Sequence, residues 1–178
     1  MTPIIQQCRQ RFGRTPRSTW DPCVRAVAEQ SSTYRGYGGQ PPVTAQDEQL
    51  WRRKVSDMQN EEIIKEFVAA WSRLDADELA SYFTEDGTYH NMPTGPVTGR
   101  DNVRAMIAEF TAPWTETEWD LLNIASDGDV VIAERLDRTK AGDKSVDLPC
   151  TGVFEMRDGK IYYWRDYFDI GTYVRAMT

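Results

Sequence analysis

The sequence predicts an α+β fold in which helices pack on one face of a curved, mostly antiparallel sheet. Apolar residues recur at helical spacing between residues 60 and 110, and strand-like segments joined by very short turns follow them. Turns this short connect antiparallel neighbours. The length of 178 residues, with 40% apolar and 28% charged residues, suits one domain of a soluble protein.

Three helices are expected before the sheet. Asn60 precedes two glutamates, which is a favourable helix start. Asp75 begins a second, shorter helix, and Arg100 lies at the start of a third. A further short helix is expected near 44–56. One face of the first helix carries the apolar residues Ile63, Ile64, Phe67, Val68, Trp71 and Leu74.

Strands dominate the rest of the chain. Gly-containing turns at Asp127-Gly128, 141–144 and Asp158-Gly159 separate runs rich in apolar and β-branched residues. The chain then ends in an expected helix over 169–177. The expected strands are 88–92, 117–125, 129–139, 145–156 and 161–168.

Charge divides the chain near residue 57. Residues 1–57 carry nine Lys or Arg and five Asp or Glu, a net of +4, whereas residues 58–178 carry a net of −11. The first segment has little apolar periodicity, so we expect residues 1–57 to be an extended tail and residues 58–178 to be the folded domain. Its arginines are dispersed and the remainder is acidic, so no nucleic-acid partner is expected.

Several enzyme classes are excluded by what the sequence lacks. His90 is the only histidine, so two histidines cannot share a metal ion, and the motifs GxSxG, GxxxxGKS/T and GxGxxG are absent. We therefore expect no metal and no cofactor. Any acid–base chemistry then falls to carboxylates.

Cysteine usage and hydropathy indicate a cytoplasmic protein. Cys8, Cys23 and Cys150 form no CxxC pair, and such a sparse, odd set is typical of reduced thiols. No stretch approaches 18 consecutive apolar residues, and the apolar run at the N-terminus is too short for a secretory signal. No contact with a membrane is therefore expected.

Polar groups share strand faces with apolar residues at three places. Residues two apart point to the same side of a strand, so Tyr89 and Asn91 point together and His90 points away. An arginine and two aspartates on such faces predict a site in an apolar cavity, although exposed cross-strand ion pairs would show the same alternation. One shared face carries Val131, Ala133, Arg135, Asp137 and Thr139, and the other carries Tyr162, Trp164, Asp166 and Phe168.

Five short runs resemble, in order and spacing, the limonene-1,2-epoxide hydrolase family. They are TYHNMP (88–93), ERLD (134–137), GVFE (152–155), DGKI (158–161) and WRDYFD (164–169). The resemblance covers about residues 60–173 and fills all five polar positions of the family's site. It implies a limonene-1,2-epoxide hydrolase-like catalytic domain over 58–178. It also implies the cone of the wider superfamily, which includes nuclear transport factor 2, ketosteroid isomerase and SnoaL-like proteins: a curved sheet around a deep pocket.

The resemblance implies a role for each polar residue. Asp166 is the general base that takes a proton from water, and Tyr89 and Asn91 hold that water. Asp137 is the general acid that protonates the epoxide oxygen, and Arg135 lies between the two carboxyls. The implied reaction adds water to a small apolar epoxide in one step and gives a vicinal diol.

The resemblance also implies an apolar pocket wall. Trp71 and Trp114 are bulkier than the Leu or Met expected there, and Thr139 replaces an expected aliphatic residue. These departures concern the identity of the epoxide and leave the chemistry intact. The implied substrate-binding residues are Val68, Trp71, Trp114, Leu148, Cys150 and Phe168.

Two other functions remain open on the sequence alone. The same scaffold supports polyketide-type cyclases and isomerases, and it also supports modules that bind a ligand without catalysis. The pair Tyr89 and Asn91 favours water as the nucleophile, and a complete acid–base set favours an enzyme over a binding module. The resemblance also suggests a homodimer.

Overall fold

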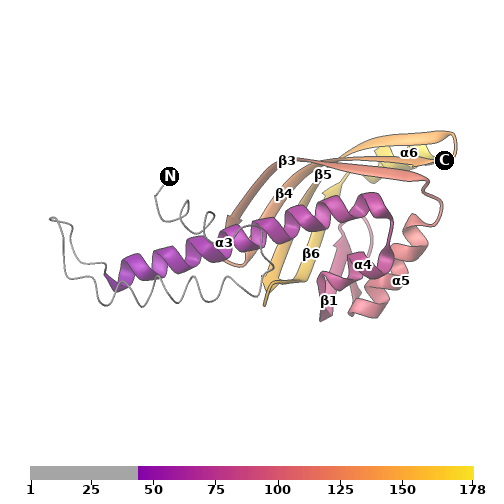
Figure 1. Ribbon diagram of the computed structural model, residues 1–178. Helices are drawn as coiled ribbons and strands as arrows, with labels where there is room; N and C mark the ends of the chain where they lie inside the picture. Colours follow the sequence, from indigo (N-terminus) through magenta and orange to yellow (C-terminus); the bar gives the residue numbers. More distant parts are fainter. Residues whose placement is uncertain (1–43) are drawn as a thin grey trace. The chain divides into compact units, whose positions relative to one another are not determined.

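The computed structural model describes residues 44–178, and a six-stranded sheet organises them (Figure 1). The sheet order is β2-β1-β6-β5-β4-β3, in which β1 and β6 are parallel and every other neighbouring pair is antiparallel. The strands are β1 (Phe83–Asn91), β2 (Val97–Thr98), β3 (Glu116–Asp127), β4 (Val130–Ala141), β5 (Lys144–Arg157) and β6 (Lys160–Phe168). The predicted α+β class and the four-stranded meander are confirmed.

Helices α3, α4 and α5 lie on one side of the sheet (Figure 1). The helical elements are α3 (Ala45–Ala70), the 3-10 turn η2 (Trp71–Arg73), α4 (Ala76–Ser81), α5 (Arg100–Thr111) and α6 (Ile170–Met177). Among residues 44–178, no helix is both long and apolar enough to cross a membrane.

α3 is one helix where the sequence predicted two. The expected capping pair is present, because the Asp47 amide donates to Thr44 Oγ1 and the Thr44 amide donates to Asp47 Oδ2. Asn60 starts no new helix; it is buried, and its Nδ2 donates to the Gly128 carbonyl in the turn between β3 and β4. The predicted boundary at residue 57 therefore falls inside a helix, and residues 1–43 of the predicted tail lie outside the described residues.

Aromatic rings fill the space between α3 and the sheet. Phe67 of α3 is fully buried and makes edge contacts with Phe83 of β1, Phe154 of β5 and Trp164 of β6, at centroid distances of 5.2–6.1 Å. Edge-to-face contacts of this kind stabilise beyond the area they bury. This cluster fixes the inner face of the sheet, on which the polar side chains described below lie.

Strand β3 carries one extra residue relative to β4. Leu121 lies opposite Arg135, whereas Asn123 lies opposite Glu134, so Leu122 has no partner in the ladder. A bulge of this kind reverses which face each residue takes beyond it. As a result Trp119 lies opposite Asp137 and faces inward.

Candidate active site

One arginine on β4 joins two carboxylates on the inner face of the sheet. Arg135 Nε donates to Asp137 Oδ1 at 3.1 Å, and Nη2 donates to Asp137 Oδ2 at 3.1 Å. Nη2 also donates to both oxygens of Asp166 on β6, at 2.9 Å each. The guanidinium therefore gives two hydrogen bonds to each carboxylate, which orients both groups.

All three charged groups are removed from water. Arg135 is 0% exposed, Asp137 6% and Asp166 2%. This burial rules out the alternative of exposed cross-strand ion pairs and agrees with a site in a cavity. Burying two carboxylates beside a single cation leaves one excess negative charge, which is relieved when one carboxyl takes a proton.

Burial raises the pKa of Asp166 to about 6, with the charge of Asp137 acting in the same direction and Arg135 opposing it. Burial alone would lower the pKa of Arg135, but the two carboxylates raise it above its ordinary value, so the guanidinium stays charged. A group with a pKa near 6 exchanges a proton readily near neutral pH.

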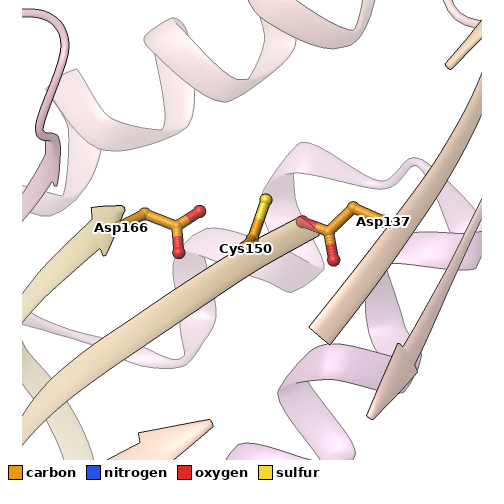
Figure 2. A group of neighbouring side chains, drawn as sticks. All are labelled: Asp137, Cys150 and Asp166. Carbon is orange, nitrogen blue, oxygen red and sulfur yellow. The ribbon is translucent and has the colours of Figure 1, made fainter. Parts of the chain in front are cut away.

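Cys150 of β5 lies between the two carboxyl groups (Figure 2). Burial raises the pKa of its thiol far above the ordinary value, and both carboxylates add to this effect. The thiol therefore stays protonated and acts as a small apolar wall residue, as the sequence predicted.

Tyr89 and Asn91 lie on β1, which runs parallel to β6. Asn91 pairs with Asp166 across these strands, and Tyr89 pairs with Trp164 and stacks on its ring at 3.9 Å. Burial raises the pKa of Tyr89 well above its ordinary value, so its hydroxyl remains a neutral hydrogen-bonding group. The intervening residue, His90, does not line the cavity, and its Nε2 lies 3.1 Å from the Thr94 carbonyl.

A cavity of about 410 Å³ opens above this cluster. Asp137, Asp166, Tyr89 and Asn91 line it, so four of the five predicted catalytic residues face one space, and Arg135 lies beneath them. Aromatic and aliphatic side chains form most of the remaining wall. Of the predicted substrate-binding residues, the cavity is lined by Trp114, Leu148, Cys150 and Phe168.

Val68 and Trp71 do not line the cavity. Both are buried in the core on and after α3, and Trp71 stacks on Trp119 at 4.0 Å with an interplanar angle of 14°. Trp119 is the wall residue in that direction, and the sequence analysis missed it. Also missed were Met106 and Phe110 on α5, Val146 on β5, and Ile170 and Tyr173 on α6.

Within residues 44–178, the one group of three close metal-ligand side chains is Asp137, Cys150 and Asp166, with ligand atoms within 4.8 Å of one another. This donor set does not suit a cation. Arg135 donates to both carboxylates and adds a positive charge at the same place, and the thiol keeps its proton. A metal ion requires a deprotonated thiol and free carboxylate oxygens.

The chain has a cone-shaped α+β scaffold with a curved sheet, and a buried carboxyl pair lines its cavity. A family model for the limonene-1,2-epoxide hydrolase catalytic domain matches residues 58–178. The chain therefore belongs to the limonene-1,2-epoxide hydrolase family, and it is an epoxide hydrolase.

Known proteins support this assignment at modest identity. Epoxide hydrolase EphG of Mycobacterium tuberculosis is 29% identical over 107 residues, which are 60% of this chain and 71% of EphG. A solved structure of an epoxide hydrolase of the same type from M. tuberculosis is 26% identical, covers 68% of this chain and 90% of its own, and has a TM-score of 0.61. An NTF2-like protein from Burkholderia pseudomallei, 20% identical, covers 67% of this chain and 98% of its own with a TM-score of 0.61 and shows the shared fold.

Proposed function

We propose that this enzyme adds water to a small apolar epoxide and forms a vicinal diol in one step. The observation that carries the proposal is the bridge from Arg135 to both Asp137 and Asp166 at the base of an apolar cavity. Such a bridge holds an acid and a base at fixed positions on either side of a bound epoxide.

Asp166 is the proposed general base. Asn91 pairs with Asp166 across the two strands, and Tyr89 lies close to this carboxylate. Both side chains are able to hold a water molecule beside it. With a pKa of about 6 it is mostly ionised at pH 7.5 and still basic enough to accept a proton from water.

Asp137 is the proposed general acid. The developing alkoxide of an opening epoxide needs a proton, and Asp137 lines the cavity from the strand opposite Trp119. In each turnover Asp166 gains one proton from water and Asp137 gives one proton to the alkoxide. Passage of a proton from Asp166 to Asp137 restores both groups, so no external acid or base is consumed. General acid–base help of this kind contributes about 10²–10⁴-fold per group.

A covalent route is disfavoured by the neighbours of the carboxyls. An aspartyl ester needs a base to activate water against it, commonly a histidine. His90 does not line the cavity. Direct attack of water uses the groups that do.

A single turnover in ¹⁸O-labelled water with excess enzyme tests the mechanism. Direct attack places the label in the diol on the first turnover, whereas a covalent ester delivers an unlabelled carboxylate oxygen. Asp137→Asn and Asp166→Asn should each stay folded and lose nearly all activity. Asp147→Asn is the matched control, because Asp147 is an exposed carboxylate on β5 and should keep full activity.

Two outcomes contradict the proposal. An unlabelled first-turnover diol would replace direct attack with a covalent route, and a fully active Asn variant at either position would remove that residue from the chemistry. Product analysis over a panel of epoxides also separates hydrolysis from ring closure by an internal hydroxyl, since only hydrolysis incorporates water.

We further propose a cytoplasmic homodimer without metal or cofactor, in which residues 58–178 form the catalytic domain. Sheet residues Leu122, Ile132 and Tyr167 are apolar or aromatic and exposed in the single chain, which supports burial against a second copy.

A further inference from the structure

We propose that Trp119 is a positioning residue that covers the Arg135 guanidinium and keeps water away from the carboxylates that this arginine bridges. Its effect on turnover rests on the proposed function, but its effect on the carboxyls does not. The contacts of Trp119 and the burial of Arg135 carry the inference.

Trp119 lies directly over the guanidinium. The Arg135 Cζ is 4.7 Å from the Trp119 ring centroid and 5.6 Å from that of Trp164. The two indole rings are 6.3 Å apart at an interplanar angle of 59°, so the guanidinium contacts both rings. Desolvated cation–π contacts of this kind are favourable.

Trp119 lines the cavity, whereas Arg135 is 0% exposed and does not. Trp119 therefore separates the guanidinium from the space that holds water and substrate. Arg135 Nη1 is buried without a hydrogen-bond partner among the described residues. The faces of two indole rings partly compensate for that missing bond.

One departure from the expected family residues contacts Trp119, and a second is linked to it through Thr117. Trp71 stacks on its ring at 4.0 Å. The Trp119 indole N–H donates to Thr117 Oγ1 at 3.1 Å, and Thr117 Oγ1 lies 2.9 Å from Thr139 Oγ1. Because Thr117 donates its own proton to the Arg138 carbonyl, it accepts from both Trp119 and Thr139. Trp71 and Thr139 thus help to fix the orientation of Trp119.

Opening this cover admits water to the carboxyl pair. The titratable groups around the pair come from several strands: Asp137 and Arg135 on β4, Cys150 on β5, Asp166 on β6 and Tyr89 on β1, with Glu109 of α5 also lining the cavity. Burial is the largest influence raising the pKa of Asp166, so hydration should lower it. Asp166 would then take up a proton only at a lower pH.

Carboxyl ¹³C NMR titration of the full chain tests this without a substrate. In Trp119→Leu, the pKa of Asp166 should fall by about one unit, and in Trp119→Phe it should lie between the values of this variant and wild type. Thr139→Val, which removes the hydroxyl next to Thr117, should lower the pKa of Asp166 by less. If hydrolysis is measured, the acidic limb of kcat/KM should move to lower pH by the same amount in Trp119→Leu.

Phe110→Leu is the matched control. Phe110 lines the same cavity but contacts Trp114 and Tyr173, so its loss should change substrate binding and leave the carboxyl titration unchanged. Unchanged pKa values in Trp119→Leu, or an equal shift in Phe110→Leu, would overturn the inference. If Trp119→Leu does not fold, Trp119→Phe and Thr139→Val decide the question. A wild-type chain that hydrolyses no epoxide would refute the proposed function and leave the titration result standing.

Discussion

Gly152→Ala is expected to displace the arginine that joins the two carboxylates. Gly152 lies on β5 between Ala133 of β4 and Asp166 of β6. A Cβ there would lie 2.6 Å from Arg135 Nη1 and 2.7 Å from a ring carbon of Phe154. Ordinary contact begins at 3.4 Å, so the guanidinium must move by about 0.8 Å and the ring by about 0.7 Å.

The ring has little freedom to move. Phe154 is fully buried between Phe67 and Trp164, so its ring moves only at a cost in stability, and Arg135 is displaced as well. Overpacking a core typically destabilises by about 1–3 kcal/mol, which lowers the midpoint of thermal unfolding by roughly 3–10 °C for a domain of this size. A displacement near 1 Å at a catalytic group reduces turnover by about 10²-fold.

Thermal unfolding and kcat on one epoxide, measured for both variants, check this expectation. Gly95→Ala is the matched control, because nothing lies within 4 Å of its added Cβ, and it should resemble wild type in both measurements. If Gly152→Ala keeps the wild-type kcat and the wild-type unfolding temperature, the placement of Arg135 against β5 is refuted. A loss of stability with full kcat would show that the displaced arginine still holds both carboxylates in place, which would contradict the expected loss of turnover.

Three further predictions concern the reaction conditions and the assembly. Since Asp166 must be ionised to accept a proton and its pKa is about 6, kcat/KM should fall about tenfold per pH unit below 6 while circular dichroism shows a folded chain; a flat profile down to pH 5 would contradict this. Dialysis against a chelator should leave activity unchanged, because Arg135 already donates to both carboxylates; a loss of activity restored by added metal would disprove this. Light scattering at micromolar concentration should give the mass of a dimer, and a monomer would remove that claim without affecting the chemistry.

Strand alternation correctly predicted which side chains share the buried face of β4. On β4 the residues Val131, Ala133, Arg135, Asp137 and Thr139 are all buried, as the period of two requires. The alternation could not say which face was concave, because that depends on the aromatic packing of α3 against the sheet. The resemblance to a known family supplied that choice, and the burial of Arg135 confirmed it.

Two bulges limit what alternation predicts. Counted regularly from the turn at Asp127-Gly128, the hairpin would put Trp119 opposite Arg138 and on the outer face. Because Leu122 has no partner, the register shifts by one residue, and Trp119 lies opposite Asp137. The ladder between β5 and β6 shifts in the same way, so Tyr162 is exposed although Trp164 is buried. An unpaired residue inside a strand leaves no clear signature in a single sequence, which is why Trp119 was missed.

The boundary predicted at residue 57 leads to a final test, in which the chain begins at Met58. The helix α3 continues through this point, so truncation removes two contacts: the ion pair of Arg53 with Asp127, and the hydrogen bond from the Gly128 amide to Asp57 Oδ1 at 2.9 Å. The ion pair is exposed and contributes about 0–1 kcal/mol, and a hydrogen bond to a charged group contributes about 1.5–3 kcal/mol.

The truncated chain should therefore unfold at a lower temperature but stay folded and keep its kcat, because the buried face of α3 begins at Asn60 and every catalytic residue lies beyond it. Asp57→Ala in the full chain removes the larger of the two contacts and should reproduce most of the loss in stability. An unfolded or inactive truncated chain would instead make the first turns of α3 part of the catalytic domain.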